Sequence, residues 1–213
     1  YLPAAKGILT LLDADNLRVQ FFAAQALGKM NHEAAFQPLV KLLEENDNED
    51  LYIRHAASLA LSRVGDAGAI ADLSSHSSSA VRLGAVIALR RLRAESIVAF
   101  LNDESEYIVA EAARAINDDF SIQAAIPELG KLLVARDFTS EPLLRRAINA
   151  NLRWGTEEAF NNLLMYANKS TAPEAMRVEA IAALSTWNSP SVLDRVDGWY
   201  RGEIERNIDG LKA

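Results

Sequence analysis

Residues 53–62 read IRHAASLALS, and the same arrangement occurs six times. An apolar residue, often followed by an arginine, comes first, and after variable positions there are closely spaced alanines before a leucine or isoleucine. Apolar positions recur every three or four residues, which predicts amphipathic helices. Period-2 alternation does not persist anywhere, so we expect no sheet. The other copies are VQFFAAQALG (19–28), VRLGAVIALR (81–90), IVAEAARAIN (108–117), LRRAINANLR (144–153), the poorest match, and MRVEAIAALS (176–185).

A second, leucine-rich kind of helix precedes several of these copies. AAFQPLVKLL (34–43) matches AAIPELGKLL (124–133), and AAKGILTLL (4–12) is a looser relative. One helix pair cannot bury its apolar face alone, so neighbouring pairs must stack. We expect a repeat domain over 1–188 and a capping segment over 189–213. The expected pairs cover approximately 1–30, 31–65, 66–93, 94–119, 120–155 and 156–188.

The ends of these units carry their own signals. Gly28, Gly65 and Gly155 are expected to end second helices, where a positive φ is often needed. The third and fourth pairs have short first helices, GAIADLSS and AESIVAFL. After Pro190 the pattern stops, and apolar side chains of the tail are expected to cover the last repeat, with docking of a following domain as the alternative. These side chains are Val192, Leu193, Val196, Trp199 and Tyr200.

The pattern V-R-x-x-A-A-x-A-L resembles the HEAT-repeat family, including its short bacterial form, over about residues 2–187. The resemblance implies an all-α fold, a right-handed α-α superhelix (a HEAT-like, armadillo-like solenoid) of about six helix pairs. A compact helical bundle is the alternative fold.

A narrower resemblance involves RVQFFAAQALGKM, YIRHAASLAL, AVRLGAVIALRRL, EAARAINDD, RRAINANLRWG and LDRVDGWYRG, in this order. Together they look like the HEAT segment of large bacterial secreted dehydrogenase-like proteins, between a β-propeller and a cytochrome c module. This implies one domain of a larger bacterial protein, periplasmic or extracellular, although a cytoplasmic location stays open. The sequence also opens inside an expected helix, so we expect a segment of something longer.

Composition restricts the chemistry. The net charge of −7 is poorly suited to non-specific nucleic-acid binding, and no apolar run approaches the roughly 20 residues of a membrane span. There is no cysteine, and His32, His55 and His76 lie in different repeats. No HExxH, GxSxG or phosphate-binding motif occurs. We therefore expect no metal, no cofactor, no catalytic residue, no nucleic-acid partner, no membrane insertion, and a monomer.

These observations favour a non-catalytic protein-interaction or scaffold module, whose partner is another protein or a neighbouring domain of the same polypeptide. The alternative is a HEAT-like enzyme, such as a bilin lyase-type or DNA glycosylase-type protein. A bilin lyase would need polar and acidic residues around a tetrapyrrole. A glycosylase would need a basic concave face, against which the net charge argues.

The candidate partner-binding residues are polar or aromatic side chains of the second helices. The consensus arginines Arg54, Arg82, Arg145 and Arg177 are expected to be structural and to bind acidic side chains or carbonyls at the turn of a neighbouring repeat. Arginines outside that position are freer to meet a partner. The candidates are Arg90, Arg91, Arg114, Asn117, Arg146, Asn149, Arg153 and Trp154.

Two features of this set leave alternatives open. The tetrapeptide RAIN occurs at 114–117 and 146–149, and Asn149 lies in mid-helix, where asparagine needs a hydrogen-bond partner. Its amide either ties the turns of repeats four to six together or lies with Asn117 on a polar stretch of the concave face. Trp187 has the register of a core residue, whereas that of Trp154 indicates exposure unless the fifth repeat is shifted by one residue.

Overall fold

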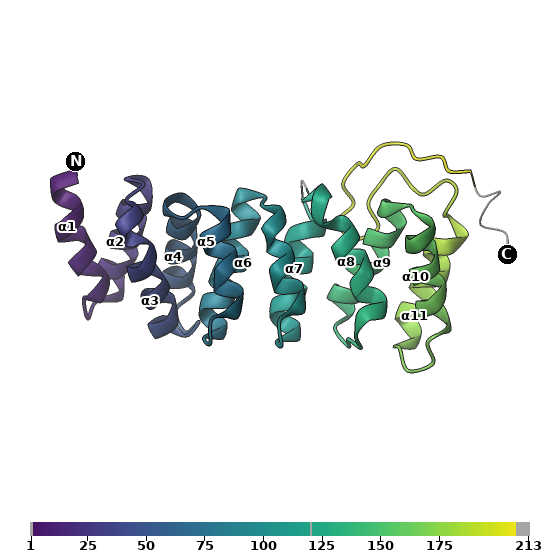
Figure 1. Cartoon of the computed structure of the whole chain (residues 1–213), viewed down its shortest axis with the longest axis horizontal. Coiled ribbons are helices and arrows are strands. Elements are labelled where there is room, and N and C mark those ends of the chain that lie inside the picture. Colours follow the sequence, from purple (N-terminus) through teal and green to yellow (C-terminus); the bar gives the residue numbers. More distant parts are fainter. Residues whose placement is uncertain (1, 120, 208–213) are drawn as a thin grey trace. The chain divides into compact units, whose positions relative to one another are not determined.

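The computed structural model describes residues 2–119 and 121–207, and in these ranges the chain is all-α (Figure 1). It divides by its contacts into two compact units, 1–108 and 109–213. Within each unit, second helices pack on second helices and first helices on first helices, as a stack of helix pairs requires.

Unit 1 contains three complete pairs and the first element of a fourth. The first helix of the third pair is short, as the sequence predicts, whereas the fourth pair has a 3-10 helix in place of the short α-helix expected there. The elements are α1 (Leu2–Thr10), η1 (Leu11–Asp13), α2 (Leu17–Lys29), η2 (Glu33–Ala35), α3 (Phe36–Asn46), α4 (Leu51–Val64), α5 (Ala67–Ala71), η3 (Asp72–Ser75), α6 (Ser79–Leu92) and η4 (Glu95–Asn102).

The alanines of the repeat let α2 and α4 approach closely. Gly28 lies in the last turn of α2, and a Cβ there would lie 2.8 Å from the Cα of Ala60 on α4. Its role is thus close packing rather than ending the helix. Gly65 does cap α4, but with an extended φ of −101°, so the expected positive φ is wrong there. Gly155 caps α9 at a φ of 70°, as predicted.

Unit 2 begins within α7 (Glu106–Asn117) and contains two further pairs and a tail. Trp187 is buried as its register predicts: it packs edge-to-face on Phe160 at 5.3 Å, and the Arg206 guanidinium lies 4.7 Å above its ring. The remaining elements are η5 (Gln123–Ala125), α8 (Ile126–Ala135), α9 (Glu141–Trp154), α10 (Glu157–Asn168) and α11 (Glu174–Ser185).

The tail does not cover the last helix pair in the way the sequence suggested. Leu193, Trp199 and Tyr200 are 50%, 49% and 67% exposed, which corrects their assignment to an apolar cap. Exposed apolar side chains also remain on α10 and α11, among them Met165 and Val178. The tail instead runs across the C-terminal ends of the second helices of unit 2, α7, α9 and α11 (Figure 1).

Arginines hold the tail in this position. Arg201 donates to the carbonyls of Asn117 and Asp119 at the end of α7, and Arg206 donates to those of Leu152 and Trp187. The last carbonyls of a helix lack partners within the helix and carry partial negative charge, so guanidinium groups stabilise them. Polar contacts to helix ends are therefore a main part of the attachment of the tail.

Candidate interaction site

Two side-chain caps position an exposed apolar surface of unit 1. The Asn16 side chain accepts the backbone N–H of Arg18 at 2.9 Å, and that of Asp50 accepts the N–H groups of Tyr52 and Ile53 at 2.8 and 2.9 Å. Such caps satisfy N–H groups that have no partner within the helix. They fix the first turns of α2 and α4, and these turns carry large apolar side chains.

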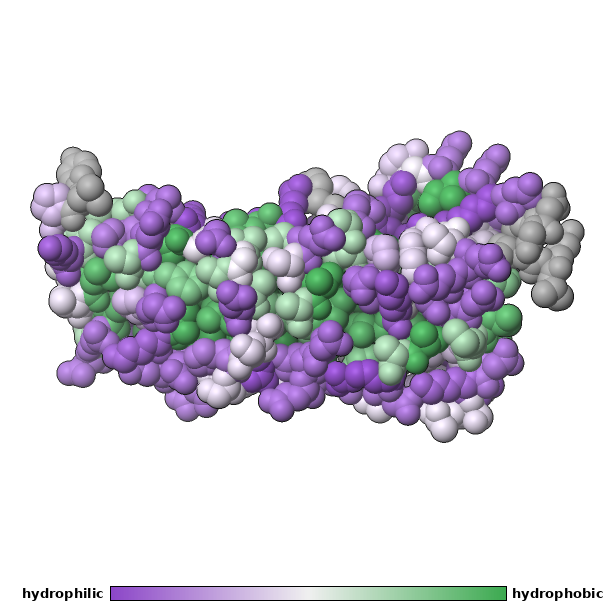
Figure 2. All heavy atoms as spheres, in the orientation of Figure 1, coloured by the Kyte–Doolittle hydropathy of each residue, from purple (hydrophilic) through white to green (hydrophobic). Residues whose placement is uncertain are grey.

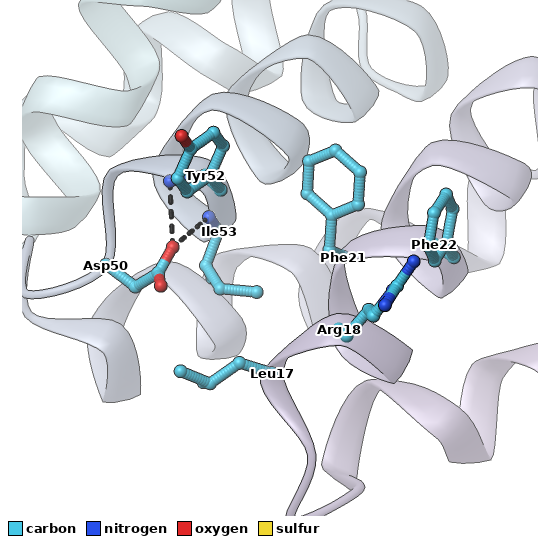
Figure 3. Close-up of a pocket in the computed structure, with 7 residues that line it drawn as sticks. All are labelled: Leu17, Arg18, Phe21, Phe22, Asp50, Tyr52 and Ile53. Atoms are coloured by element: carbon cyan, nitrogen blue, oxygen red, sulfur yellow. Dashed lines mark hydrogen bonds between the residues drawn. The ribbon is translucent and has the colours of Figure 1, made fainter.

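A hollow of about 420 Å³ lies between these two helix starts (Figure 3). Phe21 packs edge-to-face on Phe22, with ring centroids 5.2 Å apart, and on Tyr52 at 6.5 Å. Leu17, Phe22 and Tyr52 are nevertheless 52%, 55% and 75% exposed. The hollow is lined by Leu17, Arg18, Phe21, Phe22, Asp50, Tyr52 and Ile53.

A second hollow, of about 460 Å³, adjoins the first on the α1 side, and the two share Arg18 and Phe22. Its other lining residues are Ile8, Leu11, Asn16, Val19, Ala23 and Ala26. We call the two hollows together the aromatic strip. On the face of unit 1 that Figure 2 shows, apolar surface lies between edges of polar side chains.

The turns that lead into the aromatic strip are acidic. Asp13 and Asp15 precede α2, and residues 47–50, DNED, precede α4. Lys41, a nearby cation, binds Asp13 at 2.6 Å and Glu45 at 3.4 Å. Asp15, Asp47 and Glu49 are exposed in these turns, and we call these three carboxylates the acidic rim. The exposed cation Arg18 lines both hollows.

Within the described ranges 2–119 and 121–207, no group of three or more histidine, cysteine, aspartate or glutamate residues could hold a metal ion. In the same ranges, no helix combines the length and apolarity that a membrane crossing needs.

Four of the predicted residues come together in unit 2. Asn117 and Asn149 are buried, and the Asn149 amide donates to Asn117 Oδ1 at 2.8 Å. Arg146 binds both carboxylate oxygens of Asp118, at 2.9 and 2.7 Å, and Arg153 donates to Ser121 Oγ at 3.2 Å. The two asparagines therefore lie inside the molecule, at the joint between α7, α9 and the tail.

The other four predicted residues lie outside this cluster. Arg90 and Arg91 belong to the last turn of α6 in unit 1, with Arg91 exposed. Arg114 is half exposed and lies 3.7 Å from Asp118. Trp154 is partly buried, with the Lys131 ammonium 5.8 Å from its ring centroid.

Of the contacts described for the four consensus arginines, that of Arg82 matches the predicted partner, an acidic side chain at the turn of a neighbouring repeat. Arg145 meets a carboxylate in the middle of a helix, and the contacts of Arg177 and Arg54 lie within their own repeats, so the prediction is wrong for these three. Arg82 is buried and binds Asp103 at 2.8 Å, and this hydrogen bond raises the pKa of Arg82. Arg145 pairs with Glu179 on α11, and Arg177 donates to the carbonyl of Ala167. Arg54 reaches the amide oxygen of Asn48 at 3.5 Å.

The aromatic strip itself did not emerge from the sequence, although one signal pointed to it. When the repeats are aligned on their late leucine or isoleucine, Phe22 occupies a position with no other large apolar side chain. The equivalent residues are Ala56, Gly84, Glu111, Ala147 and Glu179. A large aromatic residue there is specific to the first repeat.

Comparisons with known proteins agree with this architecture. Residues 5–90, within unit 1, match the family model of HEAT repeats. No curated protein matches the chain significantly. The stacked helix pairs define an all-α helical-repeat fold, and the match places HEAT repeats in residues 5–90. The narrower resemblance to secreted dehydrogenase-like proteins stays a prediction.

Several solved structures are similar to the chain at low identity. A designed armadillo repeat protein in complex with the peptide (KR)4 is 22% identical, with a TM-score of 0.47 over 85% of this chain and 98% of that one. An engineered protein is 18% identical, with a TM-score of 0.46 over 86% and 98%. Human deoxyhypusine hydroxylase in complex with glycerol is 20% identical, with a TM-score of 0.33 over 86% and 84%.

Proposed function

We propose that the chain is a non-catalytic protein-interaction module and that the aromatic strip of unit 1 is its docking surface. The observation that carries this proposal is the exposure of Leu17, Phe22 and Tyr52 beside two adjoining hollows. Burying one such side chain against a partner contributes about 1.5–3 kcal/mol. Contiguous exposed apolar surface with a polar rim is typical of protein-binding sites, and aromatic residues dominate binding energy there.

The form of the strip restricts its partner. Two hollows on either side of Phe22 suit a segment with two large apolar side chains. The acidic rim formed by Asp15, Asp47 and Glu49 attracts a segment that also carries lysine or arginine. The phenylalanine and tyrosine rings are held against each other before binding, which reduces the entropy lost on association.

The setting of the module is a further part of the proposal. The resemblance of its repeats to those of secreted dehydrogenase-like proteins supports a place in a larger bacterial polypeptide, where a neighbouring domain would supply the segment. In that setting the module would hold domains together in the periplasm or outside the cell. An independent protein partner would use the same strip.

Selection of peptides tests the proposal. A library of random 12-residue peptides on phage is panned against the full chain, in parallel with the double variant Phe22→Asp, Tyr52→Asp. We expect the wild-type chain to enrich peptides with two large apolar residues and basic neighbours, and the double variant not to enrich them.

A matched control separates loss of binding from general disturbance. Val178 on α11 is 58% exposed, close to the 55% of Phe22, and Val178→Asp should enrich the same peptides as the wild-type chain. Circular dichroism confirms that each variant is folded. If the folded double variant and the wild-type chain enrich the same peptides, or if neither of them enriches any peptide, the aromatic strip is not a docking surface.

A further inference from the structure

The tail places one aspartate in a fully enclosed polar site. Asp194 Oδ2 accepts the Asn149 side-chain amide at 2.9 Å and Arg153 Nη1 at 3.5 Å, and its side chain is 0% exposed. Asn149 is fixed by Asn117 Oδ1 and Arg153 by Ser121 Oγ. Both side chains of α9 that bind this carboxylate are therefore fixed by further hydrogen bonds.

A second aspartate of the tail, three positions after Asp194, also binds the repeats. Asp197 Oδ2 accepts the backbone N–H of Asp119 at 2.9 Å, just beyond the end of α7. Arg201 of the tail contacts Asp194 at 3.1 Å and Asp197 at 2.8 Å. Two carboxylates of one short segment thus enter two adjacent sites on the repeats.

The segment between them has the form of a bound peptide loop. Asp194 Oδ1 accepts the backbone N–H groups of Val196 and Asp197 at 2.9 and 3.2 Å, and Gly198 has a φ of 74° that favours glycine. Trp199 and Tyr200 remain about half exposed or more. The described contacts of Asp194 and Asp197 with the repeats are made by their carboxylates.

The fit between the loop and the helices is also incomplete. A small cavity of about 20 Å³ remains between them, lined by Asn149 and Arg153 of α9 and by residues of the tail that include Pro190 and Leu193. Polar groups of Asn149, Arg153 and Asp194 line this cavity, so it suits a bridging water molecule, as is common at interfaces between segments.

We propose that Asn149, Arg153 and the Asp119 N–H form a receptor for a peptide with two aspartates three positions apart, and that the tail occupies this receptor in cis. A partner segment with the spacing Asp-x-x-Asp followed by glycine would enter the same site by displacing the tail. This receptor lies in unit 2 and is independent of the aromatic strip of unit 1.

The electrostatics favour a negatively charged occupant. Burial lowers the pKa of Arg153, as does the nearby charge of Arg201, but a guanidinium stays charged at neutral pH. A buried cation without a counterion is costly, so the receptor requires a carboxylate from one source or another. The tail supplies it within the same chain at high effective concentration, which makes the cis form the resting state.

A labelled peptide of residues 190–202, PSVLDRVDGWYRG, tests the proposal on the full chain by fluorescence anisotropy. The variant Asp194→Asn removes the charge of the cis occupant but keeps every receptor residue. We expect the peptide to bind this variant at least about tenfold tighter than the wild-type chain, because the cis carboxylate no longer competes. Alanine at both aspartates of the peptide, or Arg153→Ala in the Asp194→Asn chain, should abolish binding.

Equal affinity of the peptide for the folded Asp194→Asn and wild-type chains, or no binding to either, overturns the proposal. Hydrogen exchange of the wild-type chain tests it independently of any variant. We expect the amides of Val196 and Arg201 to exchange by local opening, much faster than that of Leu152 in α9. Exchange of all three at the rate of global unfolding would show that the tail is an inseparable part of the fold and would overturn the proposal as well.

Discussion

The side-chain amide of Asn149 donates to Asn117 Oδ1 at 2.8 Å and to Asp194 Oδ2 at 2.9 Å, so a single nitrogen joins α7, α9 and the tail. Both asparagines are buried. The hydrogen bond between them confirms the interpretation of these amides as ties between repeats. The third partner differs from the expectation, because it belongs to the tail and not to the sixth repeat.

Replacing Asn149 by leucine should lower stability. The substitution leaves Asn117 Oδ1 and Asp194 with fewer partners in a buried site, which costs about 2–4 kcal/mol. For a chain of this size that is a fall in Tm of about 5–12 °C. Asn161→Leu, at an exposed position of α10, is the control and should leave Tm nearly unchanged. An unaltered Tm in Asn149→Leu would mean that the joint contributes nothing to folding.

The same joint gives the stability a dependence on acid pH. Burial alone raises the pKa of Asp194, but hydrogen bonds from the Val196 N–H and Asn149, together with the Arg153 charge, outweigh burial and hold the pKa below its ordinary value of 3.8. A carboxyl with a lowered pKa stabilises the fold above its unfolded pKa and ceases to do so as the pH falls through the folded one.

Urea denaturation of wild type and Asp194→Asn measures this contribution. We expect the difference in unfolding free energy to be constant above about pH 5 and to shrink below about pH 4. The side chains that contact the Asp194 carboxylate are those of Arg153, Arg201 and Asn149. A difference that stays the same down to about pH 3 would contradict the assignment.

Two glycines in helices provide a matched pair of substitutions in unit 1. Gly28→Ala should destabilise by about 1–3 kcal/mol, because the new Cβ would lie 2.8 Å from the Ala60 Cα. Gly7→Ala should stabilise by about 0.5–1 kcal/mol, since nothing lies within 4 Å and alanine favours the helix. Chemical denaturation checks both. Equal effects of the two substitutions would refute the close approach of α2 and α4.

Tyr166 on α10 is buried, and among residues 2–119 and 121–207 its hydroxyl has no hydrogen-bond partner. Burial raises its pKa to about 12, so ionisation of this tyrosine opposes folding. Because a buried hydroxyl without a partner is costly, Tyr166→Phe should raise stability by about 1 kcal/mol at neutral pH. Between about pH 10 and 12 the unfolded chain releases the tyrosine proton while the folded chain keeps it, so the stability of the wild-type chain falls over this range, and this fall should be smaller in the variant. Lower stability of Tyr166→Phe at neutral pH would reveal a bond to this hydroxyl.

The repeats were predictable from the sequence because the spacing of alanine and leucine indicates which face of each helix is buried. The short first helix near Ile70 followed from the same spacing. The tail was not predictable in this way. Its apolar residues suggested a cap, but it is positioned by arginines, and the carbonyls that Arg201 and Arg206 bind carry no signal in the sequence.

The candidate site was predictable only in part. Asn117 and Asn149 were identifiable because asparagine in a helix needs a partner, although the sequence left their partner open. The aromatic strip arises from side chains of three helices, and the repeat pattern treats the position of Phe22 as variable. Its exposure depends on the packing of α1 and α4 around α2, which no single stretch of sequence specifies.

The most direct test of the account is the affinity of one selected peptide for single variants of the aromatic strip, measured by isothermal titration. Phe22→Ala and Tyr52→Ala should each weaken binding by about ten- to a hundredfold, the loss of one aromatic anchor. Val178→Ala should bind as the wild-type chain does. Unchanged affinity in both strip variants would contradict the claim that this protein acts by binding a partner segment along α2 and α4.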